Sequence, residues 1–290
     1  MADRRRARRA KASPPARAPA VAPAPTGALL PVVPASTSQF TEVARLPVAE
    51  PPVAPRAVGR GVLVFDLDGT ILDDIGPISA VAAAVLAEAF GTPTEEGRLH
   101  YLATTGMPFE AQLAQLYPDV PAATRAEVAR TFHDRKVREA YKEARPFPEM
   151  PGLLKRLGRE GWTLVVSTGA EREMADLVLE REGLRFWFEA VLGSGQGTKR
   201  EHLAEFRRRF PEAPLYLIGD SRFDMEAAGS IPGVVALARA SNLPGWALTP
   251  ADLTRWGARW ADYSLASLPE ALETAVPKGS AGRSLPRRRK

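Results

Sequence analysis

Two closely spaced aspartates near residue 66 are the residues best suited to chemistry. Asp66 and Asp68 lie two apart, directly after the apolar run 61–65, and Gly69 follows them. Side chains two apart on an extended chain project to the same side. Two carboxylates this close repel each other unless a cation or a proton lies between them, and Mg²⁺ prefers oxygen ligands. The pair therefore predicts a Mg²⁺ site, whereas a calcium loop would need further oxygen donors and no buried strand before it.

A second acidic pair follows another apolar run much later in the chain. Asp220 and Asp224 lie four apart after residues 215–218, so one helical turn brings both carboxylates to the same side. Asp224 alone is also suited to the first turn of a helix. In open α/β sheets, ligands bind at the carboxyl ends of the strands. We therefore expect the two pairs to meet around one divalent ion at such an edge.

A hydroxyl and a lysine stand where phosphate chemistry would need them. Ser167 ends an apolar run and precedes Thr168 and Gly169, so a hydroxyl and free backbone N–H groups are available for phosphate oxygens. Lys199, with Arg200 as the competing candidate, would offset the charge of the carboxylates and of a phosphoryl group. The glycines before the lysine suggest a P-loop, but that pattern needs glycine at position 198 and serine or threonine at position 200.

The elements that position these residues alternate between strands and helices. Apolar runs bounded by turn residues predict strands at residues 61–65, 162–166 and 215–218, with weaker candidates at 188–192 and 233–237. Continuous apolar strands separated by helices indicate a parallel sheet covered on both faces. Between residues 75 and 147 only helical patterns occur, at 78–90, 94–104, 109–117 and 122–144. The predicted fold class is α/β, a Rossmann-like parallel-sheet core with an all-helical insert after its first strand.

The motifs together resemble those of the haloacid dehalogenase-like hydrolase superfamily. Its Asp-x-Asp-Gly-Thr signature is matched at Asp66, Asp68, Gly69 and Thr70. Its later signatures are matched by Ser167, Lys199 and the Gly-Asp-x-x-x-Asp pattern of Asp220 and Asp224. The resemblance implies a core at residues 61–74 and 148–277. The helical segment 75–147 is similar to the small C1-type cap of the phosphoglycolate phosphatase-like branch.

The resemblance also implies a role for each matched residue. Asp66 would be the nucleophile that forms an aspartyl-phosphate, and Asp68 the general acid and base. Mg²⁺ would be held by the Asp66 and Asp220 carboxylates and the Asp68 backbone carbonyl, with Asp224 orienting that shell. Ser167 and Lys199 would position the phosphoryl oxygens. The substrate-binding residues would be Gly69, Thr70, Thr168 and Gly169.

The implied function is Mg²⁺-dependent removal of phosphate from a small phosphorylated metabolite. An acid at position 68 favours a phosphatase over the dehalogenases and phosphonate-cleaving members, which typically lack it. A small cap that excludes water favours small substrates. A phosphomutase of the same superfamily needs the same aspartate, so it stays an alternative. A binding or regulatory protein that acts on nucleic acid through basic tails is the second alternative.

Other residues carry weaker expectations. Asp74 departs from the serine or threonine that relatives often have, so no substrate is carried over from that region. The segment 104–108 is expected to be a loop between cap helices that either reaches the site or only joins the helices. The cap cations are expected to form a solvated helix face, although a cap lysine could meet a substrate anion: Lys136, Arg138 and Lys142. The histidines show no metal-ligand spacing: His100, His133 and His202.

The charge of the chain is concentrated at its two ends. The 290 residues carry a net charge of +5, of which residues 1–60 hold +7 and residues 278–290 hold +6, which leaves −8 for residues 61–277. The first 60 residues contain 15 Ala and 11 Pro, so we expect a disordered tail. The basic tails suit a polyanion such as nucleic acid, but no aromatic residues lie among the N-terminal arginines to stack on bases.

Composition excludes several classes of protein. The chain has no cysteine, which excludes disulfides, cysteine-ligated metals and thiol nucleophiles. Its longest fully apolar stretch is far shorter than the roughly 20 residues of a membrane span. We therefore expect a cytoplasmic enzyme with no membrane partner. The oligomeric state, the substrate and the role of the tails are not encoded in any motif.

Overall fold

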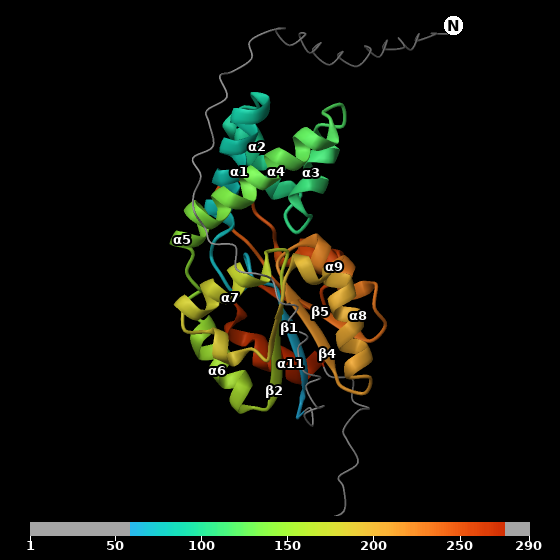
Figure 1. Ribbon diagram of the computed structural model, residues 1–290. Coiled ribbons are helices and arrows are strands. Elements are labelled where there is room, and N and C mark those ends of the chain that lie inside the picture. The colour runs from blue at the N-terminus through green and yellow to red at the C-terminus, as the bar shows by residue number, and fades with distance from the viewer. Residues whose placement is uncertain (1–58, 276–290) are drawn as a thin grey trace, which may run out of the picture. The chain divides into compact units, whose positions relative to one another are not determined.

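The computed structural model describes residues 59–275 and contains one parallel sheet. Its strands follow the order β3-β2-β1-β4-β5-β6 (Figure 1). They span β1 Gly61–Phe65, β2 Trp162–Ser167, β3 Ala190–Leu192, β4 Leu215–Gly219, β5 Val234–Arg239 and β6 Trp260–Asp262. The predicted α/β class and the five predicted strands are confirmed. The three-residue β6 was not predicted, because so short a run has no recognisable pattern.

Helices follow the strands or form the insert between β1 and β2. The insert contains α1 Ile75–Phe90, α2 Thr94–Ala103, α3 Phe109–Leu116, α4 Ala122–Arg135, the π-helix η1 Lys136–Ala140 and α5 Tyr141–Glu143. The core contains α6 Met150–Arg159, α7 Arg172–Arg181, α8 Lys199–Arg209, α9 Arg222–Gly229, α10 Pro250–Arg255 and α11 Leu268–Ala275. Short 3₁₀ turns lie at η2 Arg185–Trp187, η3 Ser194–Gln196 and η4 Leu265–Ser267.

The central strands are buried on both faces, as their continuous apolar sequences predict. In β1, Leu63 and Phe65 pack into one core cluster with α6, α7 and α11, whereas Val62 and Val64 pack into another with α8, α9 and α10. Figure 1 shows helices on either side of the sheet. Removing this apolar area from water is the main term that stabilises the sheet, at about 25 cal/mol per Å².

Strand register brings the carboxyl ends of the central strands to one edge. Phe65, the last residue of β1, pairs with Val166 of β2 on one side and with Ile218 of β4 on the other. The next residues along the three strands are Asp66, Ser167 and Gly219, and Asp220 follows. The fold therefore places the expected chemical groups of three chain segments side by side.

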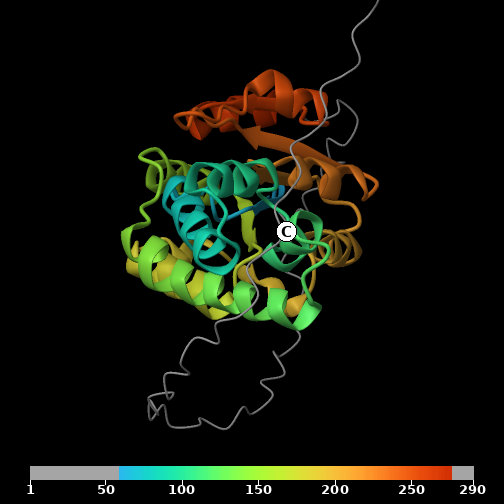
Figure 2. The same ribbon diagram turned by 90° about the horizontal axis from the view of Figure 1, so that it is seen from above.

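The insert has its own aromatic packing and returns close to where it left the core. Phe109 and Phe132 stack with ring centroids 4.0 Å apart. Figures 1 and 2 show the insert helices gathered side by side. The two chain segments that connect the insert to the core are hydrogen-bonded to each other: the Asp73 amide donates to the Arg145 carbonyl, and the Phe147 amide donates to the Ile71 carbonyl. The exact division at residues 75 and 147 stays a prediction.

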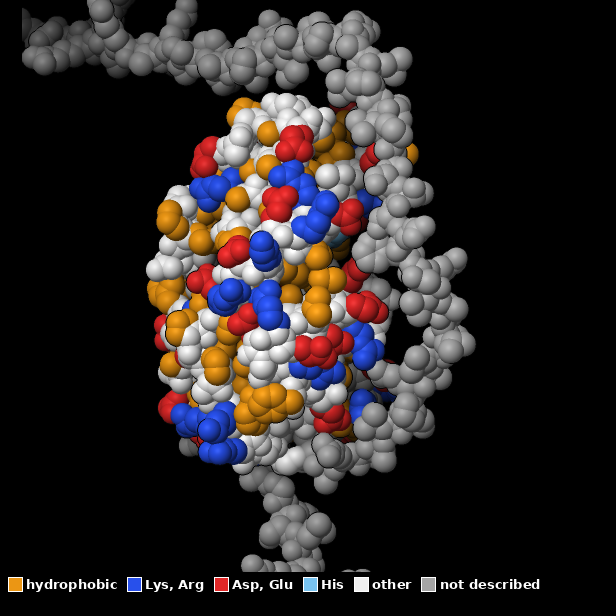
Figure 3. All heavy atoms as spheres, turned by 60° about the vertical axis from the view of Figure 1, so that its left-hand side comes forward, with side chains coloured by type: hydrophobic (Ala, Val, Ile, Leu, Met, Phe, Trp, Pro, Cys, Tyr) orange, Lys and Arg blue, Asp and Glu red, His pale blue; other side chains and the backbone are white. Residues whose placement is uncertain are grey.

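Two further observations concern the ends of the chain and the surface. The predicted tails, 1–60 and 278–290, lie outside the described residues apart from Gly59 and Arg60, and the Arg60 guanidinium lies over the Trp162 ring. None of the helices in residues 59–275 is long and apolar enough to cross a bilayer. On the face shown in Figure 3, basic and acidic side chains are interspersed, so this face has no extended basic surface.

Candidate active site

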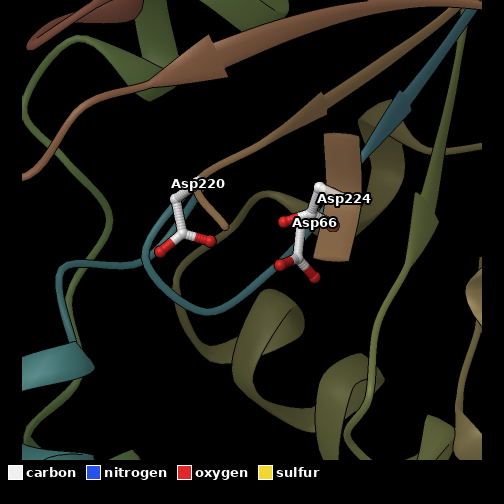
Figure 4. A group of neighbouring side chains, drawn as sticks. All are labelled: Asp66, Asp220 and Asp224. Atoms are coloured by element: carbon white, nitrogen blue, oxygen red, sulfur yellow. The ribbon is translucent and has the colours of Figure 1, made fainter. Parts of the chain in front are cut away.

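Three buried carboxylates meet at the ends of β1 and β4. One oxygen from each of Asp66, Asp220 and Asp224 lies within 4.8 Å of the other two (Figure 4). Gly69 makes the close approach possible, because it adopts a φ of +73° and a Cβ there would lie 2.1 Å from Asp220 Oδ2. The structure therefore brings Asp66 together with Asp220 and Asp224 from about 150 positions further along the chain, whereas the Asp68 carboxylate is not part of this cluster.

The three carboxylates differ in how many oxygens are already engaged. Asp66 Oδ1 accepts the Leu67 amide at 2.8 Å and lies 3.1 Å from Lys199 Nζ. Asp224 Oδ2 accepts the Ser221 amide and hydroxyl, and Oδ1 pairs with Lys199. Within residues 59–275, the Asp220 carboxylate has no hydrogen bond or ion pair. Asp220 and the second oxygen of Asp66 are therefore the open ligands.

Asp224 serves two purposes at once. Its contacts with Ser221 form a capping box at the start of α9, which is the structural role that its position also suggested. Its other oxygen holds Lys199, which comes from the first turn of α8. Arg200, the competing cation, is exposed. Lys199 is thus the cation that the fold places between Asp66 and Asp224.

The electrostatics of the cluster favour binding of a divalent cation. Burial raises the pKa of Asp66 from 3.8 to about 7; Lys199 opposes the shift, and Asp224 and Asp68 add to it. Burial, together with Asp66 and Asp224, raises the pKa of Asp220 well above its ordinary value. Burial works against the charge of Lys199, but Asp224 and Asp66 outweigh it and raise the pKa of that ammonium. One ammonium cannot neutralise three carboxylates, so the all-oxygen donor set fits a hard cation such as Mg²⁺.

Ser167 lies at the end of β2, and a histidine fixes its side chain. Ser167 is buried, and its Oγ lies 2.8 Å from His202 Nδ1 on α8. Burial lowers the pKa of His202, and the Lys199 charge adds to the shift, so the imidazole is neutral at pH 7. Sequence reasoning found no role for His202, because only the packing of α8 against the sheet brings it to Ser167.

The neighbouring predicted substrate-binding residues line the same strand ends. The Thr168 hydroxyl accepts the Ala170 amide at 3.1 Å and so shapes the turn after β2, in which Gly169 is exposed. Thr70 is fully buried, and its hydroxyl has no hydrogen-bond partner among the described residues. The expectation of several free backbone N–H groups after Ser167 was wrong in part, because the Thr168 amide donates to Leu192 and the Ala170 amide to Thr168, which leaves the Gly169 amide.

Asp68 is held by side chains of the insert. Lys136 Nζ lies 2.5 Å from Asp68 Oδ2, and Tyr141 Oη donates to Asp68 Oδ1 at 2.8 Å. Burial acts to raise the pKa of Asp68, but the charge and hydrogen bond of Lys136 outweigh it and lower that pKa. The expectation that Lys136 belongs to a solvated face was wrong, whereas Arg138 is exposed as predicted.

Asp74 and the insert loop complete the surroundings. Asp74 is fully buried, its Oδ1 accepts the Gly69 amide at 3.1 Å, and burial beside Asp68 raises its pKa well above the ordinary value. The loop at residues 104–108 does reach the core, because a Cβ on Gly106 would lie 2.4 Å from Ser221 Oγ. The loop thus contacts the residue next to Asp220.

Comparison with known proteins identifies the family. Residues 63–235, more than half of the chain, match the profile of haloacid dehalogenase-like hydrolases. The chain belongs to this family. A phosphoglycolate phosphatase from Vibrio vulnificus is 28% identical over 181 residues, which cover 58% of this chain and 78% of that protein. One from Synechococcus elongatus is 27% identical over 205 residues, covering 66% of this chain and 94% of that protein.

Solved structures share the fold. A family hydrolase from Streptococcus pneumoniae superposes with a TM-score of 0.61 at 21% identity, covering 74% of this chain and 99% of that one. A hydrolase from Pseudomonas syringae gives a TM-score of 0.63 at 18% identity, covering 75% and 100%. The family and the relatives make the chain an enzyme of the phosphatase type, as its motifs predicted.

Proposed function

We propose that this enzyme is a Mg²⁺-dependent phosphatase that hydrolyses the phosphate monoester of a small metabolite through an aspartyl-phosphate on Asp66. The observation that carries the proposal is the buried cluster of Asp66, Asp220 and Asp224 beside Lys199. Asp66, Asp220 and the Asp68 backbone carbonyl would hold Mg²⁺, with Asp224 supporting them. The ion would offset the repulsion between an anionic nucleophile and an anionic substrate.

The chain's own groups then account for both chemical steps. An oxygen of Asp66 bonds to phosphorus while the bond from phosphorus to the leaving oxygen breaks, and Asp68 gives that oxygen a proton. Asp68 next takes a proton from a water that attacks phosphorus, which releases inorganic phosphate and restores Asp66. Ser167 and Lys199 hold the other phosphoryl oxygens throughout, where charge stabilisation contributes most.

The insert supports a small substrate. A cavity of about 400 Å³ is lined by Lys136, Val137, Arg138 and Tyr141 of the insert and by Met174 of the core, among others. Lys136 and Tyr141 also contact Asp68, so this cavity is where the leaving group would lie. A cap over the site would exclude water and bulky substrates such as phosphoproteins. Phosphoglycolate is the first metabolite to test, because the relatives above are named for it.

The test combines activity with capture of the intermediate. The enzyme is assayed on p-nitrophenyl phosphate and a panel of small phosphate esters, with Mg²⁺ and with EDTA. Wild-type enzyme should release phosphate only with the metal, and acid quenching should leave a phosphate on the peptide that contains Asp66. Asp66→Asn should abolish both, whereas Asp119→Asn, at an exposed position, should abolish neither. Retained turnover in Asp66→Asn would refute the covalent mechanism, and an isomerised sugar phosphate without phosphate release would indicate a mutase.

A further inference from the structure

The last long helix of the insert changes its winding at the point where it meets the core. The chain is α-helical over Ala122–Arg135 and then forms the π-helix Lys136–Ala140, in which the Tyr141 amide donates to the Lys136 carbonyl. In an α-helix, residues five apart point about 140° away from each other. A π-turn contains one more residue, so residues five apart come onto the same side, and such turns are frequent at functional sites.

The π-turn places two hydrogen-bond donors on one carboxylate. Lys136 Nζ lies 2.5 Å from Asp68 Oδ2, and Tyr141 Oη lies 2.8 Å from Asp68 Oδ1. The Lys136 ammonium also lies 4.7 Å from the centre of the Tyr141 ring. Lys136 is 9% exposed and Tyr141 is 2% exposed, so water does not compete strongly for either donor. Both oxygens of Asp68 are thus engaged from the insert.

The orientation of the Asp68 side chain in the core therefore depends on contacts with the insert. Asp68 follows β1, and rotation of its side chain would turn the carboxylate away from a leaving oxygen. A general acid works only within hydrogen-bond reach of the atom that it protonates. Lys136 and Tyr141 come from a segment about 70 positions further along the chain, beside the cavity that would hold the leaving group, whereas Asp74 lies beside Asp68 within the core.

We propose that Lys136 and Tyr141 are positioning residues: the π-turn brings them together to orient the Asp68 carboxylate toward the leaving-group oxygen. The inference rests on the proposed function, since it requires Asp68 to be the general acid. Neither Lys136 nor Tyr141 forms a bond to the reacting phosphorus.

The decisive measurement is the dependence of rate on the leaving group. Protonation matters most for a poor leaving group such as an alkoxide and little for p-nitrophenolate. General acid catalysis contributes roughly 10²–10⁴-fold, so a misoriented acid should lose at least about ten-fold. Tyr141→Phe and Lys136→Met should therefore lower kcat about ten-fold or more on the most active alkyl phosphate, and less than about three-fold on p-nitrophenyl phosphate. A purely structural role would lower both rates equally.

Matched controls make the same chemical changes elsewhere in the insert. Tyr117→Phe removes a hydroxyl that contacts Thr92, and Lys142→Met removes an exposed ammonium one position after Tyr141. Neither should change the ratio of the two rates. In an Asp68→Asn background, Tyr141→Phe should have no further effect on the ratio, because the acid that it positions is already absent.

The outcomes separate this inference from the proposed function. Equal losses on both substrates, or an unchanged ratio in the Tyr141 and Lys136 variants, would overturn the positioning role while leaving the phosphatase intact. Phosphatase turnover that survives in Asp66→Asn would instead overturn the proposed function. If one of the two variants does not fold by circular dichroism, the other donor acts on the same carboxylate and decides the question.

Discussion

Neutralising Asp66, the proposed nucleophile, should stabilise the metal-free protein, and by an amount that depends on pH. Asp66 is 7% exposed, and burial, with Asp224 and Asp68 nearby, raises its pKa from 3.8 to about 7. Between these two values the folded protein holds a proton that the unfolded chain has released. The free energy of unfolding of the wild type therefore falls as the pH rises through this window. The side chain introduced by Asp66→Asn has no proton to lose, so its contribution to the free energy of unfolding does not change with pH.

The size of the effect follows from the shift. One pKa unit corresponds to about 1.4 kcal/mol, and Asp66 titrates over about two units between pH 5 and pH 8, which gives about 3 kcal/mol. The substitution also deprives Lys199 of one carboxylate, although Asp224 still pairs with it. The stability difference between Asp66→Asn and the wild type should therefore grow by about 2–3 kcal/mol from pH 5 to pH 8. For a domain of this size that is roughly 5–10 °C in Tm.

Urea unfolding in EDTA at pH 5 and pH 8, followed by circular dichroism, measures this change. Asp119→Asn is the control, because it removes an exposed carboxylate and should shift stability equally at both pH values. Adding Mg²⁺ at pH 8 should stabilise the wild type far more than Asp66→Asn, since a ligand that binds only the folded state stabilises it. A difference between Asp66→Asn and wild type that stays constant from pH 5 to pH 8 would refute the reasoning about the buried cluster.

Two further predictions test contacts around the site. His202→Phe should lower kcat/KM about ten-fold and weaken inhibition by inorganic phosphate, because the Ser167 hydroxyl loses its fixed partner. The double variant Ser167→Ala/His202→Phe should have the same kcat/KM as Ser167→Ala alone, and a lower value would contradict this explanation. Gly106→Ala and Gly91→Ala both place a Cβ at positive φ, +93° and +69°, and each should cost about 1 kcal/mol or more in thermal unfolding. Only Gly106→Ala should also lower kcat/KM, because its Cβ would meet Ser221, whereas nothing lies within 4 Å of a Cβ at position 91. Equal kcat/KM in the two variants would count against a role for the loop at residues 104–108 in activity.

The strand-end residues could be predicted because their signal is local. An apolar run followed by Asp66, Asp68 and Gly69 specifies a buried strand, a turn and two carboxylates within a few positions of one another. The parallel order of the strands then brings Asp220 to the same edge without further information. The fold class and the residues of the candidate metal site therefore follow from patterns shorter than about ten residues.

The contacts that the sequence did not predict depend on packing between distant segments. His202 reaches Ser167 only because α8 covers one face of the sheet. Lys136 reaches Asp68 only because the helix changes to a π-turn, whereas the periodicity of residues 122–144 indicated one continuous α-helix. An exposed and a buried lysine look alike in a charged helix, so the pattern could not tell Lys136 from Lys142.

The arrangement of charge suggests how the site admits an anionic substrate. Lys199 offsets one of the charges of Asp66, Asp220 and Asp224, which leaves about two negative charges for a divalent cation to balance. With that balance complete, a phosphoryl group needs donors besides Lys199, and the fold offers neutral ones: the Ser167 hydroxyl and the Gly169 amide, since the Thr168 and Ala170 amides already donate to Leu192 and to the Thr168 hydroxyl. Neutral, fixed dipoles stabilise developing charge without holding the product phosphate as tightly as further ammonium groups would. The Lys136 ammonium is instead engaged with Asp68.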